Sequence, residues 1–584
     1  MQNLAELHAM IDSLSIEQVA FIIVFYGNHI AAALFALRGI TVFLGRHIGF
    51  YHPDHYHLWP RLPWRIVLRL WFALKQWKER TFTFGKRASG GFASVLATLC
   101  MMYKPGNILL GRAYAFGMPL MQPIGINVKR HLFMFAMTGG GKTSALVSII
   151  SCWRGSVFLI DPKATITNSL HARDKRRWYV LDLSNISTTD SICINIFDCL
   201  KEAIERDGID AAVLWAYRIA QSLITTPEGA RSPYFYDISR GFIAGLILHV
   251  LTTHKEDDHN LPFLRDLIIQ GYRVFNEDGK EETTALEAQA LLLRSMRNNM
   301  AFDGVIAGAA TAVMNAGGET GGNVRSTLQE QTKWLDIPLV RSRLKHSDLS
   351  LSILKTENDC VLSITATVFS VREELSDFIR LLTNMVSYTF EAVTEKKGQC
   401  LTVVDEFPSL GYNEAFEVLL PVARSHGQTF LGISQDTELL EKYYPKSWEG
   451  FIGNADCVYW MASNHKRTRT YLSDTLGKVS QVEKDKQYGR KTYREVEVMD
   501  ADQVGRFLKP ESQRIIITRA GKRALKLIND PFFKALPVWR YAADPEYGDS
   551  WLRRLGRWLF DRTPLTTSKP VSSPTEENDN DTSQ

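Results

Sequence analysis

An apolar stretch followed by a glycine-rich loop and a second apolar stretch constrains this chain more than any other feature. Residues 131–143 read HLFMFAMTGGGKT, and SALVSII follows directly. Three consecutive glycines let backbone N–H groups converge on an anion, because no Cβ obstructs the approach. A strand, this loop and a helix form the context of a phosphate-binding loop. The alternative is a glycine-rich turn before a helix, which leaves the lysine and threonine unexplained.

The loop predicts a site for ATP and Mg²⁺. We expect seven residues to bind the nucleotide: Thr138, Gly139, Gly140, Gly141, Lys142, Thr143 and Ser144. Lys142 would reach the β- and γ-phosphates, Thr143 would ligate Mg²⁺, and the helix N-terminus would add its dipole. Ala136 replaces the glycine that usually opens the motif, which is acceptable if its backbone avoids positive φ.

A second motif places two carboxylates after an apolar strand. In LTVVDEF (401–407), Asp405 fits the Walker B position that holds Mg²⁺ together with Thr143, and Glu406 fits the base that activates water. Gln435 follows the apolar run TFLGIS and is expected to sense the γ-phosphate. Arg424 is a candidate arginine finger for a neighbouring subunit, or else a surface salt-bridge residue.

Eight short apolar runs alternate with helical stretches and predict a parallel-rich sheet covered on both faces. The runs are 131–137, 157–160, 178–181, 360–365, 401–404, 429–434, 457–462 and 514–518. Between about 200 and 350 the strand signal fades. Residues 285–300 and 325–335 have helical periodicity there, which predicts an inserted all-α domain.

Composition excludes several classes of protein. Apolar residues make up 45% and charged residues 22%, so the chain is not disordered throughout. The net charge of +5 is too small for a histone-like binder. Seven scattered cysteines without a CxxC pair argue against a disulfide framework or a cysteine zinc site.

The N-terminal region is predicted to anchor the chain in a membrane. Residues 19–37 are almost entirely apolar and would be about 28 Å long as a helix. Residues 1–130 contain 14 Lys/Arg and 5 Asp/Glu, and the basic residues follow the apolar run. This asymmetry predicts residues 1–18 outside the cytoplasm and the bulk of the chain inside. The alternative is a buried soluble helix. Residues 91–103 are short for a second crossing, so one or two crossings remain open.

The order of the motifs resembles the type IV secretion coupling proteins, the TraD/TraG family of conjugation ATPases. The resemblance covers roughly residues 105–540. It rests on NILLGR (107–112), His131, the glycine-rich loop, VFLIDPK (157–163), Asn195, RSPYFYDISRGFIAGLILHV (231–250), DEFPSLG (405–411), ARSHGQTFLGISQ (423–435) and NADCVYWMASNHKRTRTYLSDTLGK (454–478). Ile196 departs from the family's Asn-Pro-Leu turn. Asp161 and Lys163 match a family motif but receive no chemical step.

The resemblance implies a RecA-like P-loop domain and a homo-hexameric ring at a bacterial inner membrane, with its ATPase domain in the cytoplasm. ATP hydrolysis, with Lys142, Glu406, Arg424 and Gln435 as the catalytic residues, would drive DNA with a bound relaxase into a type IV secretion channel. Alternatives are a coupling protein for protein effectors, an assembly ATPase of the same machine, and a non-enzymatic scaffold. Which relaxase or effector is carried, the strandedness of the DNA, and the time of ring assembly stay open.

Together these patterns predict four regions. They are an anchor and basic juxtamembrane region (1–104), a nucleotide-binding domain (105–200 and 351–545), the helical insertion (201–350), and a basic helix with a disordered acidic tail (546–584). Basic residues on the insertion are candidates for phosphate contacts with DNA, or else ordinary solvated residues. They are Arg294, Arg297, Arg325 and Lys333.

Overall fold

The computed structural model describes the central part of the chain. The described residues are 91–542 except 116, 227–232, 276–280, 395–397 and 485–490, together with residue 554. The predicted membrane anchor within residues 1–90 and nearly all of the predicted C-terminal region lie outside the described residues.

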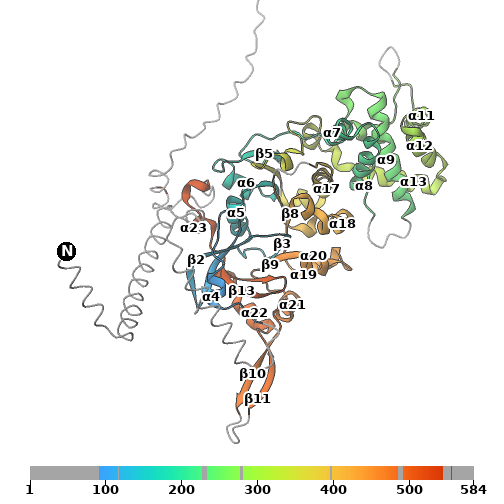
Figure 1. The fold of residues 1–584 in the computed structure, drawn as a ribbon. Coiled ribbons are helices and arrows are strands. Elements are labelled where there is room, and N and C mark those ends of the chain that lie inside the picture. Colours follow the sequence, from blue (N-terminus) through green and yellow to red (C-terminus); the bar gives the residue numbers. More distant parts are fainter. Residues whose placement is uncertain are drawn as a thin grey trace, which may run out of the picture.

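An eleven-stranded mixed sheet forms the centre of the molecule (Figure 1). In spatial order its strands are β2 (Met118–Ile126), β1 (Ile108–Ala115), β13 (Lys522–Ile528), β12 (Arg514–Arg519), β9 (Ala455–Trp460), β3 (His131–Phe135), β8 (Gln428–Ser434), β7 (Cys400–Val404), β4 (Ser156–Pro162), β6 (Cys360–Ala366) and β5 (Arg177–Asp182). Neighbours from β9 to β5 pair in parallel, whereas β2, β1, β13 and β12 pair antiparallel.

All eight predicted strands are present, and the parallel-rich sheet is confirmed. The sheet also has an antiparallel extension, in which predicted strand β12 pairs antiparallel with β9. The remaining strands of this extension, β1, β2 and β13, were not predicted.

Different helices pack against the two faces of the sheet, and the side chains of β3 illustrate this. Leu132 and Met134 belong to one hydrophobic core, whereas Phe133 and Phe135 belong to the other, because alternate side chains of a strand point to opposite faces. The first core includes residues of three helices: α5 (Lys142–Cys152), α6 (Thr165–Leu170) and α23 (Phe532–Ala535). The second includes residues of α16 (Val368–Glu373), α17 (Ser376–Ala392), α18 (Glu414–Ala423), α19 (Thr437–Tyr443), α20 (Trp448–Gly453), α21 (Lys466–Leu476) and α22 (Ala501–Phe507). The sheet is therefore covered on both faces, as predicted.

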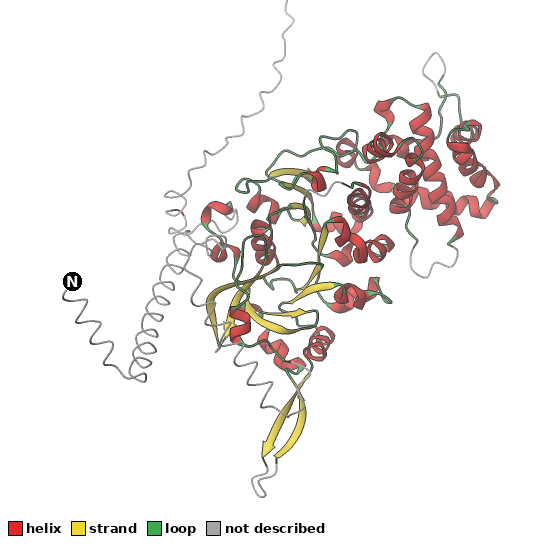
Figure 2. Ribbon diagram, viewed as in Figure 1, coloured by secondary structure: helices red, strands yellow, loops and turns green. Residues whose placement is uncertain are grey.

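A bundle of helices stands between β5 and β6 in the sequence and lies to one side of the sheet (Figures 1 and 2). Its helices are α7 (Phe197–Asp207), α8 (Ala211–Leu223), α9 (Tyr234–Thr253), α10 (Leu261–Gln270), α11 (Ala285–Asn298), α12 (Val305–Asn315), α13 (Gly318–Gln331), α14 (Pro338–Arg343) and α15 (Ile353–Thr356). Within the described residues, α9 alone has the length and apolar character of a membrane span. It is mostly buried and packs against α8, α12 and α13, so its apolar residues form the core of the bundle.

The apolar run 91–103 packs against the sheet. It contains only the five-residue helix α4 (Val95–Leu99). Phe92 bridges Ala524 of β13, and Met102 bridges Ile124 of β2. Tyr103 is 1% exposed. This run therefore forms part of the folded domain and not a second membrane-spanning helix.

A separate hairpin, β10 (Lys478–Lys484) and β11 (Lys491–Glu497), projects from the sheet at the end remote from the helical bundle (Figure 2).

Candidate active site

A cleft of about 490 Å³ opens at the carboxyl edge of the parallel strands. The glycine-rich loop after β3, the acidic pair after β7 and the glutamine after β8 all line it. The cleft collects most of the predicted site residues, which are Thr138, Gly139, Gly141, Lys142, Thr143, Ser144, Asp405, Glu406 and Gln435. Topology explains this convergence, because parallel strands deliver the residues that follow them to one edge.

The backbone of the glycine-rich loop has the conformation that its sequence allows. Gly139 and Gly141 have φ of 77° and 88°, which side chains with a Cβ rarely adopt. A Cβ at Gly140 would lie 2.9 Å from the carbonyl oxygen of Met137. Ala136 is not among the residues with positive φ, and its N–H donates to the Ser434 carbonyl of β8. Alanine therefore fits at the position where the motif usually has glycine.

Lys142 and Asp405 form an ion pair at the base of the cleft. Lys142 Nζ lies 2.7 Å from Asp405 Oδ1. Burial raises the pKa of Asp405, and the charge of Lys142 opposes this shift. The pair joins the helix that begins at Lys142 to the end of β7, so the two predicted motifs contact each other directly.

Glu406 is held at both carboxylate oxygens. Gln435 Nε2 donates to Oε1 at 2.6 Å, and Arg372 Nη2 of α16 donates to Oε2 at 2.8 Å. Burial opposes ionisation of Glu406, but these bonds and the charge of Lys142 outweigh it, so its pKa is lowered. Its φ of 58° lies in the left-handed region, which costs backbone energy in a residue other than glycine. Sequence reasoning missed Arg372, which lies 34 residues before Glu406.

Asp161 and Lys163 lie beside the cleft at the end of β4. Asp161 is 2% exposed, and its Oδ2 accepts hydrogen bonds from the N–H and hydroxyl of Thr167, each at 2.8 Å. Burial raises the pKa of Asp161 to about 6, against the effect of these two bonds. Lys163 and the following Ala164 both have positive φ, 112° and 54°. Asp161 thus fixes the start of α6, while Lys163 lines the cleft.

Arg424 lies at the opposite edge of the sheet. It begins the turn 424–426 immediately before β8, whereas Gln435 follows the carboxyl end of that strand. Arg424 is exposed and lines a different hollow, of about 500 Å³, with Arg154 and His426. The structure therefore does not bring Arg424 to the cleft of its own chain.

His131, one of the residues on which the family resemblance rests, makes contacts that indicate a structural role. It is buried at the start of β3, where Nε2 donates to the Leu420 carbonyl at 2.6 Å and Nδ1 accepts from the Phe430 N–H at 3.2 Å. Burial lowers its pKa. One donor and one acceptor match the neutral imidazole, so His131 ties β3 to α18 and β8.

The basic residues proposed for phosphate contacts are exposed on the helical bundle. They are Arg294, Arg297, Arg325 and Lys333. Lys333 pairs with Glu330 on the same stretch of chain.

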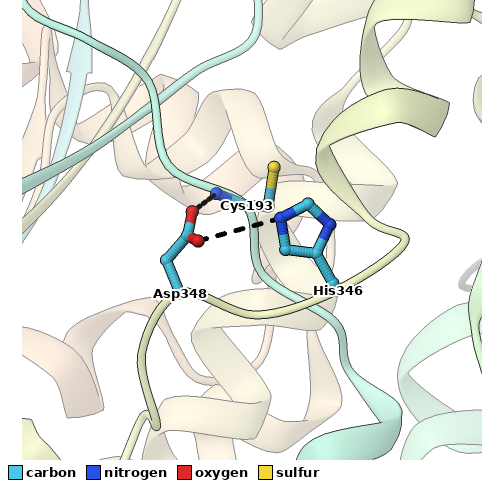
Figure 3. A group of neighbouring side chains, drawn as sticks. All are labelled: Cys193, His346 and Asp348. Atoms are coloured by element: carbon cyan, nitrogen blue, oxygen red, sulfur yellow. Dashed lines mark hydrogen bonds and ion pairs between the residues drawn. The ribbon is translucent and has the colours of Figure 1, made fainter.

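Three side chains at the base of the bundle are a candidate metal group. The ligand atoms of Cys193, His346 and Asp348 lie within 4.8 Å of one another (Figure 3). Asp348 Oδ2 accepts from the Cys193 N–H at 2.7 Å, and Oδ1 lies 3.7 Å from His346 Nε2. The Cys193 thiol is directed to the Ser342 carbonyl at 3.8 Å. These contacts hold together the two connections between bundle and sheet, and we assign the group this structural role.

Comparison with known families decides the classification. The profile described as "Type IV secretory system Conjugative DNA transfer" matches residues 98–526, which is more than half of the chain. The chain belongs to this family. The resemblance to the TraD/TraG coupling proteins is therefore confirmed.

Individual relatives agree with the family assignment. The chain is 25% identical over 416 residues to Protein VirD4 of Rhizobium radiobacter, covering 68% of this chain and 56% of that protein. It is 26% identical over 374 residues to the conjugal transfer protein TraG of Escherichia coli, covering 60% and 55%. The match thus spans little more than half of the length of these relatives.

Solved structures establish the fold. The bacterial conjugative coupling protein TrwBdeltaN70 matches with a TM-score of 0.55 at 16% identity, covering 78% of this chain and 96% of that chain. TrwB in complex with ADP and Mg²⁺ matches with a TM-score of 0.54 at 14% identity, covering 76% of this chain and 96% of that chain. The chain therefore has the TrwB fold, a RecA-like P-loop fold with added helices.

Proposed function

We propose that this protein is a membrane-anchored ATPase that recruits a relaxase–DNA complex and drives it into a type IV secretion channel during conjugation. The observation that carries the proposal is the single cleft in which Lys142 contacts Asp405 while Gln435 and Arg372 hold Glu406. Membership of the conjugative DNA transfer family supplies the biological process. A non-enzymatic scaffold would have no need of this assembled set of charges.

The residues of the cleft fit ATP and Mg²⁺. Gly139 and Gly141 expose the loop backbone, and the N-terminus of α5 faces the cleft, which suits phosphate. Thr143 and Asp405 provide a hydroxyl and a carboxylate, which are the oxygen ligands that Mg²⁺ prefers. The bound metal would neutralise charge on the β- and γ-phosphates. The complexes of TrwB with ADP and Mg²⁺ and with an ATP analogue support the same use here.

Glu406 is the proposed base. Its lowered pKa keeps it ionised at neutral pH, and its two hydrogen bonds fix the direction of the carboxylate. A fixed carboxylate can orient a water molecule and accept its proton during attack on the γ-phosphate. Gln435 links the end of β8 to this base and is proposed to report the state of the γ-phosphate to it. Lys142 would stabilise negative charge on the transferred group.

Arg424 is proposed to act on the nucleotide of a neighbouring subunit. Its position at the edge of the sheet remote from its own cleft supports action between subunits. Such an arrangement requires head-to-tail contacts between subunits, which form a ring when the rotation between them closes. We propose that the ring is a homo-hexamer. A ring also gives the translocated DNA a central path. We propose that it lies at the inner membrane with the described domain in the cytoplasm.

A trap variant tests the function. Glu406→Gln keeps the shape of the side chain but cannot accept a proton, so this variant should bind ATP without hydrolysing it and hold its substrate. We expect relaxase–DNA to co-purify with Glu406→Gln in ATP and not with Lys142→Ala, which cannot bind the phosphates. Recovery of protein without nucleic acid would favour effector coupling instead. Equal recovery with both variants would contradict nucleotide-dependent substrate binding.

A further inference from the structure

A turn near the C-terminal end of the described chain contacts the back of the glycine-rich loop. The turn, residues 529–531, connects β13 to α23, which begins at Phe532. Asn529 Nδ2 donates to the Gly141 carbonyl at 2.9 Å. The Phe532 N–H donates to Ser144 Oγ at 3.4 Å. These two segments lie almost 400 positions apart in the sequence. They are joined by one hydrogen bond to the residue before Lys142 and by another to a residue after it.

The turn is itself fixed to the antiparallel extension of the sheet. Asp530 accepts two hydrogen bonds from Arg112 of β1, both at 2.5 Å. The Asn529 N–H donates to the Gln513 carbonyl, immediately before β12. Asn529 is 8% exposed, so its amide is screened from water. The β1, β12 and β13 region thus gives Asn529 a rigid support.

The hydrogen bond from Asn529 fixes the orientation of the peptide group between Gly141 and Lys142. The Gly141 carbonyl accepts from both Ala145 N at 3.1 Å and Asn529 Nδ2. The N–H of a trans peptide points opposite to its carbonyl, so these bonds direct the Lys142 N–H away from Asn529. Lys142 lines the cleft. A hydrogen bond to the Gly141 carbonyl also polarises this peptide group. The Lys142 N–H of the same group thereby becomes a stronger donor.

Gly141 also shows how closely Asn529 approaches. A Cβ at Gly141 would lie 2.9 Å from Asn529 Nδ2. The φ of Gly141, 88°, is a second reason for glycine at this position. The loop and the turn are therefore complementary surfaces in direct contact.

We propose that Asn529 is a positioning residue for nucleotide binding, acting through the Gly141–Lys142 peptide. The inference rests on the proposed ATP site. Asn529 does not touch the cleft, so its effect is on the direction and strength of the Lys142 N–H as a phosphate donor. Because the contact lies outside the cleft, we expect it to be the same with ATP and with ADP bound. Its loss should therefore weaken binding of ATP and ADP alike, raising KM with kcat nearly unchanged.

The test measures binding of Mg·ADP to the full-length protein in detergent by titration calorimetry. Asn529→Ala removes the donor and should weaken binding about five- to tenfold, the effect of one hydrogen bond. Asn529→Asp is nearly isosteric and should fold even if the alanine variant does not. At pH 8 its carboxylate faces the Gly141 carbonyl without a proton to donate, so binding should be at least as weak.

Acidification separates hydrogen bonding from general damage. Burial should raise the pKa of the introduced carboxyl in Asn529→Asp, so that at pH 6 it is partly protonated and can donate again. The charged groups lining the adjoining cavity are Arg112 and Asp530, which are paired with each other. Relative to the parent at the same pH, Asn529→Asp should recover affinity at pH 6, whereas Asn529→Ala should not.

Asn413→Ala is the matched control. Asn413 is 3% exposed and donates through Nδ2 to Asn384 Oδ1 at 2.8 Å, outside the cleft. This variant should bind Mg·ADP like the parent. Parental affinity in both Asn529 variants, or equal loss in the Asn413 control, overturns the inference. Absence of binding by the parent itself would instead overturn the proposed ATP site.

Discussion

At the scale of single residues, Asp161 is an unusual buried acid. Its raised pKa means that the folded protein holds this proton more tightly than the unfolded chain does. Stability should therefore fall as the pH rises from about 4 to about 6, by a contribution on the order of 3 kcal/mol, and remain lower above pH 6.

Asp161→Asn removes this ionisation and keeps an oxygen to accept from Thr167. The difference in melting temperature, variant minus parent, should become more positive between pH 5 and pH 7.5. Thr167→Val removes one hydrogen-bond donor to the Asp161 carboxylate. This variant should therefore lose more stability than the parent does as the pH rises. Scanning fluorimetry across this pH range provides the measurement. A constant difference for Asp161→Asn would show that the carboxyl titrates normally.

The sequence alone predicted those residues of the candidate site that belong to a short local motif directly after a strand. Lys142, Asp405 and Glu406 have this character, because a glycine-rich loop or an acidic pair after an apolar run is a local pattern. Arg372 reaches the site from α16, and Asn529 contacts the back of the glycine-rich loop from the turn after β13. No local pattern marks either residue. Their identification required the packing of distant segments.

At the scale of elements, the parallel strands were predictable because they are buried on both faces and therefore almost wholly apolar. The strands that were not predicted lack this almost wholly apolar character. β2 contains Pro119 and Pro123, and β1 contains Gly111, residues that weaken a strand signal. The hairpin β10–β11 is largely polar and lies outside the main sheet. The helical bundle was recognised by periodicity, while its exact division from the sheet domain stays a prediction.

The apolar run 91–103 supplies a test at this scale. Tyr103 is buried beside β2, and its N–H donates to the Pro123 carbonyl at 3.0 Å. Tyr103→Ala in the full-length protein should cost about 3 kcal/mol of stability, as for other large aromatic side chains in a core. Tyr103→Phe keeps the ring and should cost about 1 kcal/mol or less. Chemical denaturation measures both. An unchanged midpoint for Tyr103→Ala would contradict packing of this run on the sheet.

At the scale of the whole molecule, the opposite placement of Arg424 and the cleft predicts cooperation between subunits. Arg424→Ala should bind ATP nearly like the parent and hydrolyse it about 10³-fold or more slowly, because a finger acts mainly in the transition state. Mixed with Lys142→Ala, it should regain partial ATP turnover. Some interfaces in the mixed rings then combine an intact Lys142 on one subunit with an intact Arg424 on its neighbour. An inactive profile at every mixing ratio, in rings shown to be mixed, would contradict action in trans.

The most direct test of the account is steady-state ATP turnover by the parent, Lys142→Ala and Asp405→Ala, with folding checked by circular dichroism. Lys142 and Asp405 contact each other in the cleft rather than support a core, so both variants should fold. The account predicts turnover by the parent and none above background in either variant. Undiminished turnover in either folded variant would contradict the assignment of this cleft as the ATPase site.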